Sequence, residues 1–174
     1  MTDSNQGVTA TIETSAGNIT LEFLTDKAPK HVANFVSLAQ AGFYNGTRFH
    51  RTIPGFMIQG GCPNTKDLEK SHLWGTGGPG HSVDAEFNDT PHVRGIFSMA
   101  RSNDPNSAGS QFFLCHGEAG FLDGQYTAFG RMLSGDEALE AIATAPTEPG
   151  GEGSTPVNPV EITCVTIQRV AAEA

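Results

Sequence analysis

The 174-residue sequence has little positive charge and no long apolar run. Ten lysine and arginine residues stand against 19 aspartate and glutamate residues, and the net charge of −9 argues against an electrostatic nucleic-acid binder. No apolar run approaches the roughly 18–20 residues that a membrane-spanning helix needs. The first ten residues, MTDSNQGVTA, lack the basic and apolar regions of a signal peptide. We therefore expect a cytoplasmic protein that binds neither nucleic acid nor membrane.

Cysteine is also scarce. The three cysteines, Cys62, Cys115 and Cys164, are odd in number and widely spaced, which predicts free thiols and no disulfide framework. The six histidines show no metal-ligand spacing, the carboxylates are scattered, and the G-x-S-x-G elbow of hydrolases is missing. These absences argue against metal-dependent, glycosidase and serine-hydrolase chemistry, and we expect no metal ion and no cofactor.

One stretch matches a cofactor-binding pattern by its letters alone. Residues 75–80 (GTGGPG) fit the dinucleotide fingerprint G-x-G-x-x-G. However, Pro79 lies inside the match, no convincing strand precedes it and no amphipathic helix follows it. We therefore expect this stretch to be a loop, within an irregular region that covers residues 61–95.

The glycine and proline content indicates a chain with many turns. With 21 glycines and 10 prolines, short apolar segments are separated by turn signals, as in mainly β proteins. A first helix is predicted from Pro29 to a stop at Gly42, and a second is predicted to open with a capping box of Ser134 and Glu137. The predicted strands cover residues 8–13, 18–24, 49–53, 56–60, 95–100, 110–115, 126–132 and 160–170.

This order of elements predicts a closed eight-stranded antiparallel β-barrel that is capped by two α-helices. The chain is long enough for one domain with a substantial core. We assign that domain to residues 8–170, after a flexible N-terminus at 1–7 and before a C-terminal tail at 171–174.

The most informative stretch is residues 49–61 (FHRTIPGFMIQGG), in which two short strands flank a Pro-Gly turn. Side chains alternate across a strand, so Met57 and Gln59 are predicted on one face and Phe56 and Ile58 on the other. Taken alone, the stretch slightly favours a core hairpin with a solvated arginine. The alternative is a surface where Arg51 works beside large apolar groups.

A second strand, at residues 110–115 (SQFFLC), favours that alternative. Alternation places Gln111 and Phe113 on one face, and Phe112 and Leu114 on the other. Two adjacent phenylalanines that face opposite ways require apolar surroundings on both sides. One side can be the core, and the other is predicted to be an apolar groove of the kind that a soluble monomer seldom exposes without a use. An arginine, two glutamines and apolar groups suit peptide binding better than covalent catalysis.

Four segments resemble, in order, the signature segments of the cyclophilin family of peptidyl-prolyl cis-trans isomerases. They are residues 49–61, 98–100 (SMA), 109–113 (GSQFF) and 121–124 (FLDG). The resemblance runs from about Val8 to Val170 and is closest to bacterial-type members, given the compact 84–97 region and the longer 101–105 loop. It implies an eight-stranded barrel whose site lies on the outer face, because side chains fill the interior.

The resemblance also implies the site residues. The essential arginine of the family corresponds to Arg51. Phe121 stands where many members have tryptophan, and Tyr126 where many have histidine, which implies weak cyclosporin binding and a changed substrate preference. The substrate-binding residues that the resemblance implies are Phe56, Met57, Gln59, Ala100, Arg101, Ser102, Asn103, Gln111, Phe113, Phe121, Leu122 and Tyr126.

The implied activity is acceleration of X-Pro bond rotation in peptides and in unfolded or flexible chains, by a monomeric enzyme. The rotation barrier of roughly 18–20 kcal/mol reflects amide resonance, and in the twisted state the prolyl nitrogen becomes a hydrogen-bond acceptor. Arg51 can donate to that nitrogen while it stays charged. Two alternatives are a proline-peptide binding or chaperone module whose catalysis is incidental, and a purely structural barrel, which would not need Arg51, Gln59 and Gln111 together.

Overall fold

The computed structural model describes residues 8–149 and 153–169, so the expected flexible terminus at 1–7, Val170 and the tail at 171–174 lie outside the described residues. The elements follow the predicted order, with three short 3-10 helices in addition. The strands are β1 (Val8–Thr14), β2 (Gly17–Phe23), β3 (Arg51–Ile53), β4 (Met57–Gly60), β5 (Ile96–Met99), β6 (Phe112–Cys115), β7 (Ala128–Ser134) and β8 (Ile162–Arg169). The helices are α1 (Pro29–Gln40), α2 (Asp136–Thr144), η1 (Pro63–Lys66), η2 (Leu68–Leu73) and η3 (Gly120–Leu122).

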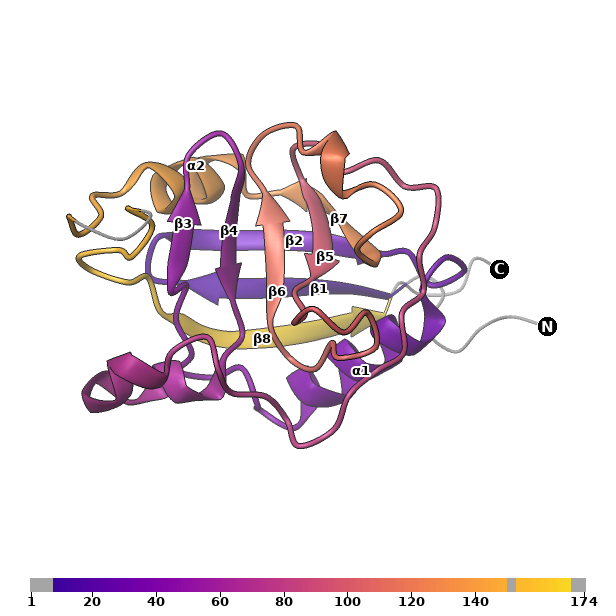
Figure 1. The fold of residues 1–174 in the computed structure, drawn as a ribbon, viewed down its shortest axis with the longest axis horizontal. Helices are drawn as coiled ribbons and strands as arrows, with labels where there is room; N and C mark the ends of the chain where they lie inside the picture. The colour runs from indigo at the N-terminus through magenta and orange to yellow at the C-terminus, as the bar shows by residue number, and fades with distance from the viewer. Residues whose placement is uncertain (1–7, 150–152, 170–174) are drawn as a thin grey trace.

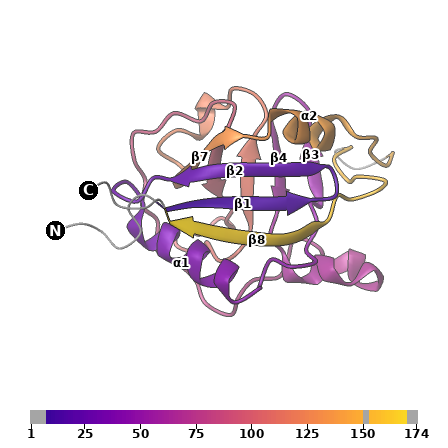
Figure 2. The same cartoon turned by 180° about the vertical axis from the view of Figure 1, so that it is seen from behind.

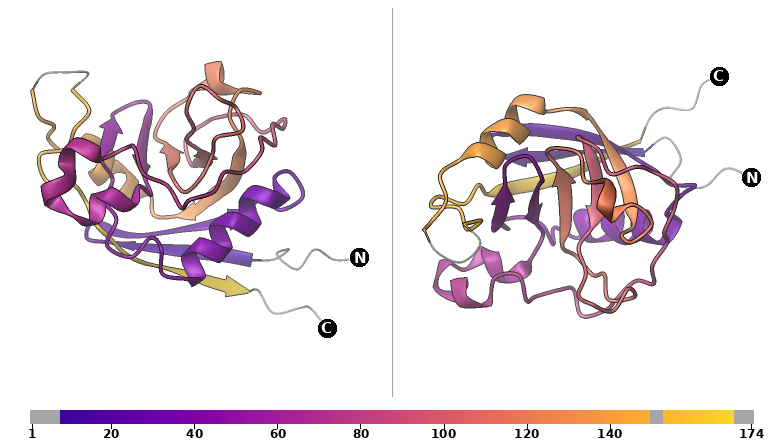
Figure 3. Two further views of the ribbon diagram at one scale, coloured as in Figure 1. Left: turned by 60° about the horizontal axis from the view of Figure 1, so that its bottom comes forward. Right: turned by 45° about the horizontal axis from the view of Figure 1, so that its top comes forward.

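All eight strands form one antiparallel sheet in the order β3-β4-β6-β5-β7-β2-β1-β8. The sheet curls, so that β3, β4, β6 and β5 cross in front of β2, β1 and β8 (Figure 1). From behind, β2, β1 and β8 form the opposite wall (Figure 2). The helices lie at opposite ends of the front strands, with α1 beside β8 and α2 beside β3 and β4, as the two views of Figure 3 also show.

The prediction of a closed barrel is wrong, because the sheet is an open, curled half-barrel whose edge strands, β3 and β8, form no mutual ladder among the described residues. β3 has only three residues and cannot extend along β8. The edges approach each other just before these strands, where Arg48 and Glu161 form an isolated bridge. There Phe49 N donates to Val160 O at 3.0 Å. The two edges therefore meet only in a short seam of backbone hydrogen bonds, and the sheet stays open.

Inside the curl lies the main core, which confirms the predicted alternation in β6. Phe112 and Leu114 belong to this core, whereas Phe113 and Cys115 belong to a second apolar cluster on the other side of the strand. Phe112 is fully buried, and its ring contacts four others in the core (Phe35, Tyr44, Phe49 and Phe97). Because the interior is filled in this way, ligands can reach only the outer face of these strands.

The first α-helix begins at Pro29 as the sequence predicts, whereas the second begins differently from the expectation. Ser134 ends β7 and pairs with Thr20, so the predicted capping box does not form. The N-cap of α2 is Gly135, whose φ of 113° lies in the left-handed region that suits glycine. At α1 the chain supplies a distant cap, because Glu86 accepts hydrogen bonds from the backbone of Lys30 and His31. A carboxylate at this position also complements the helix dipole.

The region at residues 61–95 has more local order than its sequence predicts, since η1 and η2 both lie within it. Leu68 of η2 is exposed, and the half-buried Trp74, which follows η2, donates from its Nε1 to Asp67 O at 3.2 Å. No helix in the described part of the chain is long and apolar enough to span a bilayer.

Candidate active site

On the outer face of β4, β5 and β6, the second apolar cluster forms the floor of the candidate site. Met57, Phe113 and Leu122 are its buried members that line a cavity on this face, and Phe56 packs against the cluster. This corrects the predicted pairing of Phe56 with Ile58. Phe56 belongs to the turn that precedes β4, so strand alternation does not apply to it, and its ring turns towards the outer cluster.

A cavity of about 110 Å³ opens above this cluster, a volume suited to one small apolar ring. Its walls combine apolar groups with one amide and two guanidinium groups. Arg51 reaches it because β3 and β4 pair in the register Arg51–Gln59, which places the arginine beside Gln59 at the rim. The lining residues are Arg51, Phe56, Met57, Gln59, Ala100, Arg101, Phe113, Leu122 and Tyr126.

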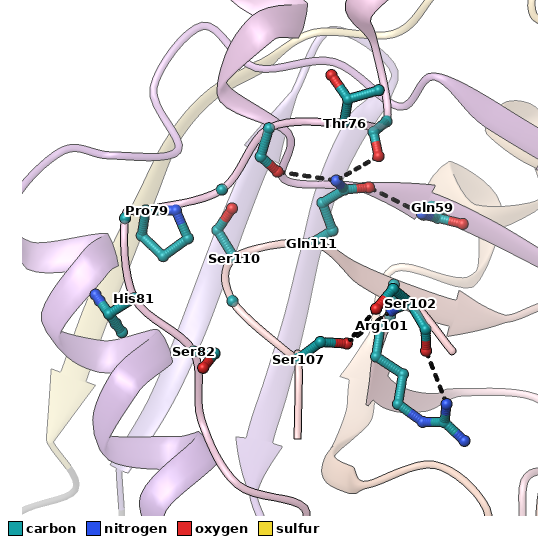
Figure 4. A pocket seen from close by; sticks show the side chains of 16 residues that line it. Gln59, Thr76, Pro79, His81, Ser82, Arg101, Ser102, Ser107, Ser110 and Gln111 are labelled. Atoms are coloured by element: carbon teal, nitrogen blue, oxygen red, sulfur yellow. Dashed lines mark hydrogen bonds between the residues drawn. The ribbon is translucent and has the colours of Figure 1, made fainter. Parts of the chain in front are cut away.

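Three polar side chains form a connected row along the rim. Arg51 NH1 donates to Gln59 Oε1 at 3.4 Å, and Gln59 Nε2 donates to Gln111 Oε1 at 3.0 Å. Gln111 Nε2 in turn donates to the carbonyl oxygens of Gly75 and Gly77, both at 2.9 Å (Figure 4). Because every amide in the row has a defined partner, the orientation of both glutamines is determined by the network.

The segment after β5 forms the wall opposite Gln59. The Arg101 guanidinium lies 4.4 Å from the centre of the Tyr126 ring and donates to Gln125 O through Nε and NH2. Ser102 lies in a neighbouring, larger cavity, together with Gln111. Asn103, which was predicted as a binding residue, lines neither cavity.

Phe121 also lies outside the cavity lining. Its side chain is 71% exposed, and its ring centre is 5.5 Å from that of Phe56, in a tilted arrangement. Phe121 therefore extends the apolar surface beyond the cavity without entering it. Its place at the site is that of an exposed aromatic edge.

Sequence reasoning missed the polar support beneath the apolar floor. His92 is buried and lies parallel to the Phe113 ring, with ring centres 6.1 Å apart. Its Nδ1 is 3.0 Å from Asp123 Oδ1, and its Nε2 is 2.9 Å from Ser98 Oγ. Asp123 directly follows Leu122, and His92 packs on Phe113. The contact between His92 and Asp123 therefore connects the Leu122 wall of the cavity with the Phe113 wall. Asp123 is 31 positions from His92, and no local pattern could have revealed their contact.

The electrostatic setting of Arg51 includes a neutral neighbour. Burial, and next the charge of Arg51, lower the pKa of His50 to about 4. At neutral pH His50 is therefore uncharged, and it adds no second positive charge beside the guanidinium. Burial likewise raises the pKa of the Cys115 thiol, beneath the site, to about 12, with a further contribution from Asp123.

Beside the small cavity lies a larger, more open one of about 690 Å³, which Figure 4 shows. Gln59, Ala100 and Arg101 line both, so the two cavities form one continuous surface. The glycine-rich stretch at residues 75–80, predicted to be only a loop, forms the far wall of the larger cavity. The high glycine content was the one signal in the sequence that the backbone of this stretch could come close to the site.

Comparisons with known proteins agree with this geometry. The family described as "Cyclophilin type peptidyl-prolyl cis-trans isomerase/CLD" matches residues 9–167, nearly the whole chain, and the chain belongs to this family. It is 50% identical over 133 residues to a peptidyl-prolyl cis-trans isomerase of Synechococcus elongatus, covering 76% of this chain and 85% of that protein. It is 48% identical over 129 residues to one of Helicobacter pylori, covering 73% and 74%.

Solved structures show the same fold. A cyclophilin-type peptidyl-prolyl cis-trans isomerase of Cryptosporidium parvum, crystallised in the presence of the dipeptide Ala-Pro, superposes with a TM-score of 0.82. The two chains are 32% identical, and the match covers 93% of this chain and 99% of the other. The protein is thus an enzyme of the peptidyl-prolyl cis-trans isomerase class, as its sequence predicts.

Proposed function

We propose that the protein accelerates X-Pro bond rotation by a hydrogen bond from Arg51 to the prolyl nitrogen of the twisted amide. The observation that carries this proposal is the position of Arg51 on the rim of a cavity sized for a proline ring, with Phe113 and Met57 in its walls. Twisting the bond localises the lone pair on nitrogen, so a donor aimed there binds the transition state better than either isomer. The apolar walls hold the ring while the preceding residue turns.

Gln59 and Gln111 are proposed to hold the peptide backbone before the proline. Gln59 lines both cavities and Gln111 lines the larger one, where the residues preceding a bound proline would lie. Their network with Arg51 preorganises donors and acceptors, so little ordering remains to be done when the substrate binds. Ala100 and Arg101 lie across the groove and are proposed to contact the same stretch of substrate.

We further propose that the enzyme acts as a monomer in the cytoplasm, on proline-containing peptides and unfolded chains. The three cysteines are free thiols, which suits a reducing compartment. A binding or chaperone module with incidental catalysis is the alternative function. The decisive experiment measures isomerisation of a short Ala-Pro peptide at enzyme concentrations far below that of the peptide. Many turnovers per molecule support the enzyme, whereas an effect that stops at stoichiometric amounts supports the binding module.

A further inference from the structure

Cys62 stands behind the glycine-rich wall of the larger cavity. It is fully buried two residues after the end of β4, and its Sγ accepts hydrogen bonds from the backbone N–H groups of Gly75 and Gly77, both at 3.3 Å. The backbone of Cys62 is held separately, because Thr65 donates to Cys62 O from its backbone N at 3.1 Å and from its Oγ1 at 2.6 Å. The sulfur thus has a role of its own, which is to anchor two amides of the wall.

The same two glycines hold Gln111 from their other side. Their carbonyl oxygens accept both hydrogens of the Gln111 amide, at 2.9 Å each (Figure 4). If the amide were turned over, its oxygen would face two carbonyl oxygens, which is repulsive. The wall therefore determines which end of the Gln111 amide faces Gln59, and Gln111 Oε1 accepts from Gln59 Nε2. That contact in turn leaves Gln59 Oε1 as the acceptor for Arg51.

We propose that Cys62 is a positioning residue of the isomerase site, which acts through the backbone of Gly75 and Gly77 on the row formed by Gln111, Gln59 and Arg51. The inference rests on the proposed function of these side chains in substrate binding and catalysis. Every link has one permitted direction. Two N–H groups donate to the sulfur, and two carbonyls accept from Gln111. The orientation of the Gln111 amide then determines that of the Gln59 amide.

A second set of contacts holds the segment before the wall, so the sulfur has a distinct task. Asn64 Nδ2 donates to Leu73 O at 3.1 Å and to Thr76 Oγ1 at 3.3 Å. A Cβ atom at Gly77 would lie 2.9 Å from this Nδ2, which explains the glycine there. Asn64 thus fixes the approach of the chain, while Cys62 holds the N–H groups of Gly75 and Gly77, each one peptide group before a carbonyl that faces Gln111. Removing the sulfur acceptor frees the backbone of both glycines, and with it the two carbonyls, to change orientation.

The test compares Cys62→Ala, which removes the acceptor, with Cys62→Ser, which restores one at nearly the same place. We expect Cys62→Ala to lower kcat/KM for an Ala-Pro peptide by about fivefold, the scale of one modest hydrogen bond, and Cys62→Ser to recover most of it. The side-chain NH2 resonances of Gln59 and Gln111 should move in Cys62→Ala and return in Cys62→Ser. If the alanine variant does not fold, Cys62→Val replaces it, because valine fills the space without an acceptor.

The matched control is Cys164→Ala, which removes a thiol from β8 whose Sγ contacts Glu13 Oε2 at 3.1 Å. We expect it to leave kcat/KM and the glutamine resonances unchanged. Full activity with unmoved resonances in Cys62→Ala would overturn the proposal, as would a Cys62→Ser variant no better than the alanine one. If instead the proposed function is wrong, a different result is expected. Arg51→Ala then keeps its activity, while the glutamine resonances still move in Cys62→Ala and return in Cys62→Ser.

Discussion

Gln59 donates a hydrogen bond of 3.0 Å from its Nε2 to Oε1 of Gln111, although the two residues are 52 positions apart. The contact arises because β4 and β6 pair in the register Gln59–Phe113, which places Gln111 diagonally across from Gln59. Arg51 stands opposite Gln59 on the other side, in β3. Sheet pairing thus assembles a row of polar side chains beside an apolar cavity, and the predictions below follow from that arrangement.

Arg51→Ala should remove most of the turnover while the fold stays intact. The lost hydrogen bond is charge-assisted and forms mainly in the transition state, so we expect a barrier higher by about 2–4 kcal/mol, or a loss of about 30- to 900-fold in kcat/KM. Arg131→Ala is the control, because that exposed arginine pairs with Glu22 on β2 and lies outside the site. A folded Arg51→Ala variant with nearly full activity would show that the proposed mechanism is wrong.

Phe112 and Phe113 should respond differently to alanine. Phe112 is buried in the main core, so Phe112→Ala should lower the free energy of unfolding by about 3–5 kcal/mol. Phe113 lines the small cavity, so Phe113→Ala should chiefly weaken peptide binding and turnover. Urea unfolding and an isomerisation assay on both variants provide the comparison. The assignment of faces fails if both variants lose stability and activity in the same proportion.

The order of the elements could be predicted from the sequence because alternation, glycine and proline are local signals. The start of α2 could not. Ser134 and Glu137 have the spacing of a capping box, but Ser134 is used by the sheet, where it pairs with Thr20. Tertiary pairing overrides a local preference of this size, and Gly135 takes the N-cap position. The open edges of the sheet likewise depend on the short length of β3, which no local signal specifies.

The candidate site, too, has a part that could be predicted from the sequence and a part that could not. The residues around the small cavity could be proposed from strand faces and family resemblance, and the structure does bring Arg51, Gln59 and Phe113 together. Their support could not be proposed, since His92 and Cys62 act through contacts with distant segments. Asn103 is the reverse case, because the resemblance places it in a stretch whose other members line the groove, whereas Asn103 itself lines neither cavity.

His50 should make stability depend on pH. In the unfolded chain an imidazole has a pKa of about 6.5, whereas in the folded protein burial and the charge of Arg51 lower it to about 4. Below about pH 6.5 the unfolded chain therefore binds a proton that the folded protein does not, and stability falls. At pH 4 this difference in proton binding alone should make the free energy of unfolding about 3 kcal/mol lower than at neutral pH.

Urea unfolding of the unmodified protein and of His50→Asn, measured at pH 7, 5.5 and 4, tests this expectation. The variant should lose less stability between pH 7 and pH 4. His31, whose pKa burial also lowers, titrates in both proteins and cancels in the comparison. Identical slopes for the two proteins would show that His50 is not the group responsible.

All three thiols should be free in the isolated protein. Alkylation under denaturing, non-reducing conditions should modify Cys62, Cys115 and Cys164, as counted by mass spectrometry. Without denaturant, Cys115 should react very slowly, because it is buried and its raised pKa keeps the thiolate scarce. A Cys62–Cys115 disulfide in freshly prepared material would contradict the proposed reducing compartment.

Phe121 should make the protein a weakly inhibited isomerase. The family resemblance implies that cyclosporin, a cyclic apolar peptide, would occupy the same groove as proline substrates, where a tryptophan at the matching position could donate its indole N–H to an inhibitor carbonyl. Phenylalanine offers the aromatic edge without a donor. An inhibitor carbonyl that loses its partner costs roughly 1–3 kcal/mol, or about 5- to 150-fold in affinity.

Phe121→Trp should therefore tighten cyclosporin binding much more than it changes turnover. Because Phe121 is 71% exposed and its ring lies tilted against that of Phe56, outside the cavity lining, an indole should fit there without disturbing the cavity. Short proline peptides that fill only the cavity do not reach this position, so their kcat/KM should stay nearly constant. Titration of cyclosporin against both forms, followed by isomerisation, separates the two effects. Nanomolar inhibition of the unmodified protein, or an unchanged affinity in the variant, would refute the role assigned to the missing donor.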